Sequence, residues 1–157
     1  MLIALLLAAT PAAPPAAPPA AATLEARSGS TVSGTVNLSQ SGKDVKVVID
    51  LIGATPGEHA VHIHKKGDCS APDASSAGSH YNPAGVAHGD AMGTMHHPGD
   101  FGNVVVGADG KGHKELTTTS FGLGEVVGLA VIVHEKKDDF SQPVGNAGGR
   151  QACGMIK

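Results

Sequence analysis

The residues with the clearest chemistry in this sequence are seven potential metal ligands, six histidines and one aspartate. They are His62, His64, His80, His88, His97, Asp100 and His134. Neutral imidazole is the commonest protein ligand for transition metals, and a mixed histidine and carboxylate set suits copper and zinc better than calcium or magnesium. Because seven ligands are more than one four-coordinate ion requires, the set predicts two adjacent metal ions.

The spacing of these ligands predicts which kind of element carries each of them. His62 and His64 lie two residues apart, so on a strand both side chains leave the same face and can bind one ion. His134 ends an apolar run that is typical of a strand. The ligands between positions 80 and 100 follow neither a helical nor a strand period, so we expect them to come from a folded loop.

The other three histidines, His59, His96 and His113, are expected to have ordinary structural or surface roles. His59 points to the face opposite His62 if the strand continues straight, and His113 lies in a turn rich in Gly and Lys. A histidine-rich metal-buffering tract would be dense and low in complexity. Here the histidines are spread over strand ends and a Gly-rich loop, which disfavours such a tract.

Short alternating apolar runs separated by turn residues indicate an all-β chain. The predicted strands include residues 32–38, 45–51, 104–106, 116–119 and 126–133. One face of the last run would be formed by Val127, Leu129, Val131 and Val133. With 22 glycines and 10 prolines, no window supports a helix of useful length. About eight strands would form an antiparallel sandwich or flattened barrel, with the insert at residues 65–101 as a functional loop.

The N-terminus resembles an export signal followed by a linker. Residues 1–9 are apolar but too few to span a bilayer as a helix, and a Pro/Ala-rich tract follows to about residue 22. No Lys or Arg precedes the apolar run, and candidate cleavage sites lie near Ala13 and Ala22. We therefore expect a signal segment and linker over residues 1–22, one domain over residues 23–157, and a periplasmic or secreted protein.

Cys69 and Cys153 are the only two cysteines in the sequence. An even pair in an exported domain predicts one disulfide, although two free thiols are the alternative. A bridge would tie the 65–101 loop, which contains Cys69, to the C-terminal strand.

Charge and hydropathy limit the partners of this protein. The net charge of -3 and the lack of a basic run with interleaved aromatic residues exclude a nucleic-acid surface. No stretch after the leader is apolar enough for a membrane partner. A homodimer and a monomer are both consistent with the sequence.

The ligands occur in motifs that resemble the copper/zinc superoxide dismutases, and the bacterial exported branch in particular. The motifs are HAVHIH at residues 59–64, GDC at 67–69, SAGSHYNP at 76–83, HG at 88–89, HPGD at 97–100, VHEKKDD at 133–139 and GNAGGRQACG at 145–154. The match runs from about residue 31 to the C-terminus, and the short segment at residues 135–149 is closer to the bacterial form. The resemblance implies a Greek-key, immunoglobulin-like sandwich of eight strands with a long metal-binding loop.

The resemblance also implies two metal cofactors, copper and zinc, and a substrate, superoxide. Copper would be bound by His62, His64, His80 and His134. Zinc would be bound by His80, His88, His97 and Asp100, so that His80 bridges the two ions as an imidazolate. The implied reaction is the dismutation of superoxide to molecular oxygen and hydrogen peroxide, in which copper cycles between two oxidation states and zinc is structural.

Further roles follow from the same resemblance. Arg150 would attract the anionic substrate at the open face of copper, and Asp138 would hydrogen-bond one copper and one zinc histidine. Cys69 and Cys153 would form the family's intrachain disulfide. For Lys136 and Lys137 the sequence favours neither of two roles, steering of the substrate or ordinary contact with solvent. The alternative function is a copper or zinc binding or delivery protein on the same scaffold, but such a protein needs neither the arginine nor the bridging histidine.

Overall fold

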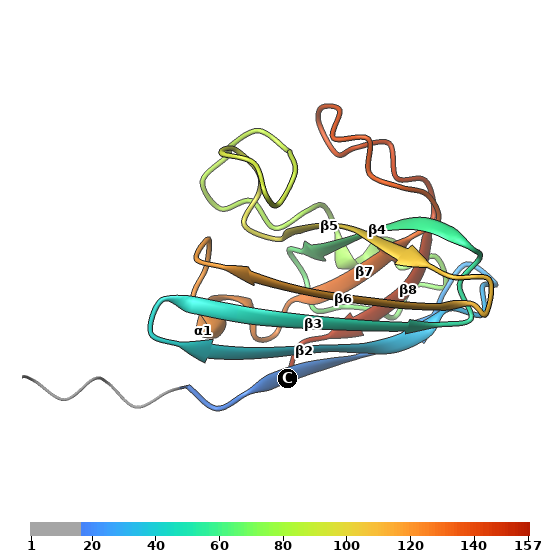
Figure 1. The fold of residues 1–157 in the computed structure, drawn as a ribbon, viewed down its shortest axis with the longest axis horizontal. Helices are drawn as coiled ribbons and strands as arrows, with labels where there is room; N and C mark the ends of the chain where they lie inside the picture. The colour runs from blue at the N-terminus through green and yellow to red at the C-terminus, as the bar shows by residue number, and fades with distance from the viewer. Residues whose placement is uncertain (1–16) are drawn as a thin grey trace, which may run out of the picture.

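The computed structural model describes residues 17–157, which form a closed barrel of eight antiparallel strands (Figure 1). The strands are β1 Ala20–Ala26, β2 Ser33–Ser41, β3 Asp44–Ile52, β4 Gly57–His64, β5 Asp100–Val106, β6 Lys111–Thr118, β7 Ala130–His134 and β8 Arg150–Met155. Around the barrel they follow the order β1-β2-β3-β6-β5-β4-β7-β8, so the β3–β4 and β6–β7 connections each pass over two strands. The expected all-β, eight-stranded antiparallel architecture is confirmed. Residues 1–16, most of the expected signal segment, lie outside the described residues.

Strict alternation of apolar and polar residues produces the barrel wall. In β3, Val45, Val47, Ile49 and Leu51 are at most 1% exposed, and the residues between them face solvent or are half-buried. Burying each such side chain contributes roughly 1.5–3 kcal/mol. β7 differs because all five of its residues are buried. The strand that carries His134 is therefore covered on both faces.

The barrel begins a few residues earlier than the sequence indicated. β1 starts at Ala20, pairs with β2 and buries Ala20, Ala22 and Leu24. Residues 20–22 were expected in the linker because they continue a Pro/Ala-rich tract. Their small side chains nevertheless alternate inward and outward, and pairing with β2 makes them a strand.

The predicted strand at residues 126–133 is wrong in its first half. Val126 ends the short helix α1 Leu123–Val126, and β7 begins only at Ala130. Gly128 between them adopts a φ of 87°, a left-handed conformation that interrupts an extended chain. Val127 is consequently 48% exposed, so it does not share the buried face of Val131 and Val133.

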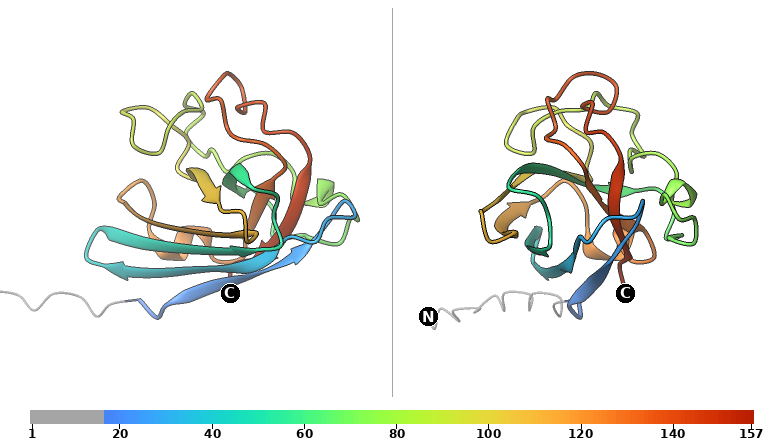
Figure 2. Two further views of the ribbon diagram at one scale, coloured as in Figure 1. Left: turned by 45° about the vertical axis from the view of Figure 1, so that its right-hand side comes forward. Right: turned by 90° about the vertical axis from the view of Figure 1, so that its right-hand side faces the viewer.

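Two long loops rise on the same side of the barrel, as both views in Figure 2 show. One spans residues 65–99 between β4 and β5 and contains the 3-10 turn Ser75–Ala77; the other spans residues 135–149 between β7 and β8. We call them the first and the second loop. Within the described part of the chain, no helix has the length and apolar character needed to cross a membrane.

Candidate metal centre

The neighbouring strands β4 and β7 supply three of the histidines. His62 and His64 lie on β4, and His134 ends β7. β4 and β7 are hydrogen-bonded in register, with His62 opposite Ile132. The barrel wall therefore fixes the backbone of these three residues before any ion binds.

The first loop folds back along β4 and brings His80 next to the three strand histidines. His80 forms an isolated antiparallel bridge with His64. The backbone N–H of Tyr81 donates to the carbonyl of Ile63 at 2.8 Å. The segment around His80 is thus attached to β4 by main-chain hydrogen bonds.

Four histidines from these elements converge on one point. One nitrogen from each of His62, His64, His80 and His134 lies within 4.8 Å of the others. All four residues are at most 7% exposed. Within residues 17–157, His62 Nδ1, His64 Nε2 and His134 Nε2 are buried and have no hydrogen-bond partner. Buried polar atoms are rarely left unpaired, so these inward lone pairs fit a bound metal ion.

The other ring nitrogen of each strand histidine is held by an oxygen atom. His62 Nε2 lies 2.7 Å from Asp138 Oδ2, and His64 Nδ1 lies 2.8 Å from the carbonyl oxygen of Gly78. His134 Nδ1 lies 3.4 Å from the carbonyl oxygen of Gly148. Because these oxygens only accept, the proton sits on the outward nitrogen, and the inward nitrogen presents a lone pair.

A second set, His80, His88, His97 and Asp100, comes from the first loop and the start of β5. Asp100 Oδ2 lies 2.9 Å from His88 Nδ1. Asp100 Oδ1 lies 3.4 Å from His97 Nδ1 and 3.5 Å from His80 Nδ1. The three Nδ1 atoms and Asp100 Oδ1 are buried and make no well-oriented hydrogen bond to any described residue. Three nitrogens and one carboxylate oxygen form a donor set that suits zinc.

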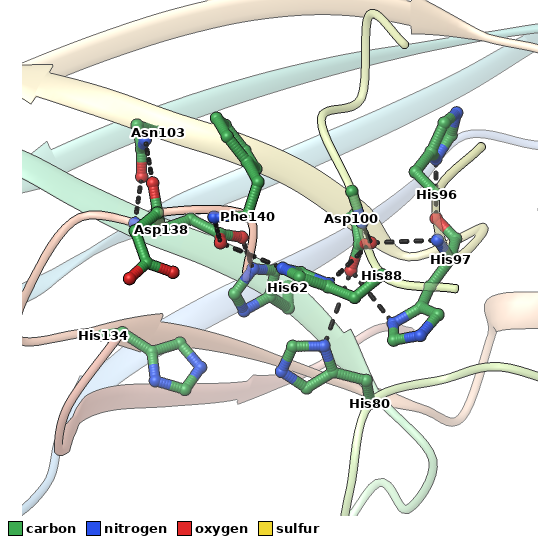
Figure 3. Close-up of polar contacts among 12 residues, drawn as sticks. His62, His80, His88, His96, His97, Asp100, Asn103, His134, Asp138 and Phe140 are labelled. Atoms are coloured by element: carbon green, nitrogen blue, oxygen red, sulfur yellow. Dashed lines mark hydrogen bonds and ion pairs between the residues drawn. The ribbon is translucent and has the colours of Figure 1, made fainter. Parts of the chain in front are cut away.

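His80 belongs to both sets and joins them. Its Nδ1 faces Asp100, while its ring packs against His62 with a centroid distance of 4.2 Å (Figure 3). A single imidazole has one nitrogen for each of two ions. The structure therefore brings all seven sequence-predicted ligands into two adjacent sets with one shared residue.

Asp138 connects the two sets from the second loop. Its Oδ2 accepts from His62 Nε2 at 2.7 Å and its Oδ1 from His88 Nε2 at 2.9 Å. Asn103 on β5 holds the Asp138 backbone by two hydrogen bonds, accepting from its N–H at 2.7 Å and donating to its carbonyl at 3.0 Å. The N–H of Phe140 also donates to Asp138 Oδ1 at 2.8 Å. Asn103 was missed in the sequence, where a lone Asn on a strand gives no signal.

Gly145 is a second residue that the sequence did not single out. Its φ is 77°, and a Cβ at this position would overlap the Asp138 carboxylate and the His88 ring. Only glycine lets the second loop pass this close to the carboxylate. The GNAGG motif at residues 145–149 contained the signal, but its spatial meaning required the fold.

His88 differs in electrostatic character from the strand histidines and from His97, whose pKa burial also lowers. Burial lowers the pKa of His64 to about 3 and also lowers the pKa values of His62 and His134. Burial acts in the same direction on His88, but the carboxylates of Asp100 and Asp138, which lie 2.9 Å from its two ring nitrogens, outweigh it and raise the pKa of His88 to about 9. The strand histidines are therefore neutral and ready to bind a cation at neutral pH, whereas His88 without a metal holds a proton in its place.

Arg150 lines a pocket of about 260 Å³ beside the four histidines, together with His64, His80, His134 and Val144. Its Nη1 donates to the carbonyl of Ala74 at 2.8 Å and its Nη2 to the carbonyl of Gly78 at 2.7 Å. The guanidinium is thus anchored to the first loop and faces the pocket. Lys136 and Lys137 are exposed and do not line it.

The disulfide and the remaining histidines agree with the sequence analysis. Cys69 and Cys153 are bonded with a Cα–Cα distance of 5.7 Å, which ties the first loop to β8. His59 is a satisfied core residue, with Nδ1 2.8 Å from the carbonyl of His134 and Nε2 2.8 Å from that of Thr55. His113 is an exposed surface residue paired with Asp50, and His96 belongs to neither ligand set.

Comparison with known proteins gives a consistent result. Residues 32–156 match the family described as copper/zinc superoxide dismutase. An extracellular Cu-Zn superoxide dismutase of Brugia pahangi is 35% identical over 148 residues, which cover 86% of this chain and 73% of that protein. A Cu-Zn superoxide dismutase of Onchocerca volvulus is 36% identical over 143 residues, covering 82% of this chain and 90% of that protein. A crystal structure of the clock protein EA4 is similar in fold, with a TM-score of 0.78, 37% identity, and coverage of 88% of this chain and 92% of that one.

Proposed function

Because the chain belongs to the copper/zinc superoxide dismutase family, we propose that its two histidine sets are the copper and zinc sites of the enzyme. The protein is a superoxide dismutase that uses copper and zinc and converts superoxide to molecular oxygen and hydrogen peroxide. The proposed copper ligands are His62, His64, His80 and His134. The proposed zinc ligands are His80, His88, His97 and Asp100.

One observation carries this assignment: the inward donor atoms are buried and unpaired among the described residues, while the outward nitrogens of His62, His64 and His88 are hydrogen-bonded. Histidines that bind metals typically donate their other N–H to a carboxylate or a carbonyl. Histidines that serve only packing pair both nitrogens, as His59 does. The pattern at the two sets is that of ligands.

The residues around the metals have separate tasks. Copper, when bound, supplies the alternate one-electron oxidation and reduction of superoxide. His80 would give one nitrogen to each metal ion, and its copper-facing nitrogen, when free of copper, would carry a proton for the formation of hydrogen peroxide. Asp138 orients His62 and His88 together. Arg150 keeps its charge at any working pH and is positioned in the pocket to hold an anion.

The alternative of a copper or zinc carrier without turnover is disfavoured by Arg150 and His80. A carrier needs no fixed cation in a pocket next to its ligands, because that cation repels the cargo. It also gains nothing from a residue shared between two ions. Both features are explained by a small anionic substrate that must reach copper.

The test is metal content and dismutase activity measured on the same reconstituted protein. One copper and one zinc per chain are expected, with activity only when copper is present. His134→Gln should lose copper and keep zinc, because His134 belongs to one set only. His113→Gln is the matched control, since its side chain is exposed and paired with Asp50 on the barrel surface. A single metal site at excess of both ions would overturn the two-site assignment.

We also propose export, to the periplasm or the extracellular space, as in the bacterial exported branch. The Cys69–Cys153 disulfide supports an oxidising compartment, and the second loop supports that branch because its length is closer to the bacterial form. β1 begins at Ala20, so cleavage near Ala13 leaves the barrel intact, whereas cleavage near Ala22 removes part of β1. Mass spectrometry of the mature N-terminus tests this. Sedimentation equilibrium tests the homodimer against the monomer.

A further inference from the structure

The first loop presents two methionines to solvent next to the second ligand set. Met92 is 85% exposed and Met95 is 62% exposed. Methionine is among the residues that are most often buried, and these two contribute nothing to the hydrophobic core. Packing therefore does not explain two of the chain's four methionines.

His96 follows directly, and its hydrogen bonding is that of a metal ligand. Its Nδ1 lies 2.8 Å from the carbonyl oxygen of His97, so Nδ1 carries the proton in the neutral ring. Nε2 then presents a lone pair, and none of the described residues makes a hydrogen bond to it. Figure 3 shows the His96 ring directed away from the other histidines. The Nδ1 atom of His96 is therefore held by a carbonyl, as those of His64 and His134 are, while its ring is half-exposed rather than buried.

The backbone holds these three residues on one short closed segment, residues 89–96, which we call the methionine segment. The N–H of Gly93 donates to the carbonyl of Asp90 at 2.8 Å, and the N–H of Met92 donates to Asp90 Oδ1 at 3.0 Å. A Cβ at Gly89 would overlap the carbonyl oxygen of Met95, so the two ends of the segment are in contact. Gly89 N also donates to Asp100 Oδ2 at 3.3 Å, which fixes the base of the segment.

We propose that Met92, Met95 and His96 form a third metal site, selective for Cu(I). Thioether sulfur is a soft ligand that prefers Cu(I), and imidazole binds copper in either oxidation state. Zinc favours thiolate, imidazole and carboxylate, so two thioethers and one imidazole make a poor zinc site. None of the three residues belongs to the two sets already described. The site does not depend on the assignment of those sets.

The test is a Cu(I) titration of the holoprotein, already loaded with copper and zinc, without oxygen, with ascorbate and a colorimetric Cu(I) chelator as competitor. One additional Cu(I) per chain is expected, with copper–sulfur scattering in X-ray absorption. Met92→Leu/Met95→Leu should weaken this extra site at least tenfold, and His96→Gln should weaken it less. Met155→Leu is the matched control, because Met155 is 37% exposed but lies on β8.

Two results would overturn the proposal. The first is a holoprotein that takes up no additional Cu(I). The second is an additional Cu(I) that the double methionine variant retains with unchanged affinity, or whose scattering shows only nitrogen and oxygen. Copper and zinc content before the titration is measured for every variant, so damage to the main centre is detected separately.

Discussion

The two ligand sets share His80 but differ in what holds their other members. His62, His64 and His134 lie in buried parts of two adjacent strands of the barrel. His88 and His97 lie on the first loop, which has only one 3-10 turn of regular structure. The barrel fixes the three strand histidines without help, whereas the disulfide and a few polar contacts hold the first loop, and a bound ion would add to its order. The two proposed metal sites therefore differ in how firmly the protein alone holds their ligands.

Metal removal should produce the largest difference between the two sets, in how well their backbone amides are protected from hydrogen exchange. A ligand at 1,000 times its dissociation constant stabilises what it binds by about 4 kcal/mol, or roughly a thousandfold. We expect amide hydrogen exchange in residues 80–99 to accelerate by about that factor in metal-free protein, while β4 and β7 stay protected. Exchange mass spectrometry measures both. Equal acceleration of strands and loop would contradict the division.

Asp138 is the residue through which the two sets can be uncoupled. Asp138→Asn replaces one acceptor oxygen with a donor, so His62 and His88 can no longer both be held. Losing such a partner typically costs about 10- to 100-fold in metal affinity or activity. Zinc affinity should fall by this factor and copper affinity by less, because β4 still positions His62.

The matched control for that variant is Asp139→Asn. Asp139 is exposed and bonds only within the second loop, to Ser141 and Asn146. It should leave both affinities unchanged. If Asp138→Asn weakened copper as much as zinc, the strands would not be the independent support that the comparison assumes.

Arg150 should act on the copper side alone. Its guanidinium lines the pocket beside His64, His80 and His134, a pocket whose lining does not include His88, His97 or Asp100. Arg150→Ala should slow dismutation by about 10- to 100-fold, because a unit charge near the incoming anion is worth up to about 3 kcal/mol at an effective dielectric of 20. The rate should also depend less on ionic strength. Copper and zinc content should be unchanged.

Pulse radiolysis over a range of salt concentrations measures this effect. Lys136→Ala is the comparison variant, since Lys136 is exposed and outside the pocket, and its effect should be at most about threefold. An Arg150→Ala protein with the parental rate and salt dependence would show that the pocket cation does not hold the substrate.

The same contrast explains how much could be read from the sequence. Residue types and strand spacing indicated two metals, and family motifs divided the seven ligands into the sets that the structure brings together. The strands with strict alternation were also predicted. The sequence did not predict the contacts that depend on how the backbone of the two loops is placed. Asn103 holds Asp138, Gly145 makes room for it, and the Gly78 carbonyl accepts from both His64 and Arg150.

Two errors in the fold have a related cause. β1 was hidden because Ala20 and Ala22 resemble the Pro/Ala tract before them, and only pairing with β2 makes them a strand. Val127 continued an apolar alternation but was turned outward by the left-handed Gly128. In both places, tertiary context overrode a local pattern.

The smallest expected effect is the pH dependence of the metal-free protein, in which His64 and His88 should act in opposite directions. The pKa of His64 is about 3 in the fold, below the unfolded value near 6.5, so its contribution to stability is present above pH 6.5 and is lost as the pH falls. The pKa of His88 is about 9, above the unfolded value, so its contribution is present below pH 6.5 and is lost as the pH rises toward 9. When the pH rises from 6.5 to 7.5, the melting temperature of the metal-free protein should fall by about 3 °C more than that of the His88→Gln variant. When the pH falls from 6.5 to 5.5, the melting temperature of the metal-free protein should fall by a similar amount more than that of the His64→Gln variant. Calorimetric scans of the three proteins give both slopes. Two slopes of the same sign would show that His64 and His88 do not differ in the way their burial and carboxylate neighbours indicate.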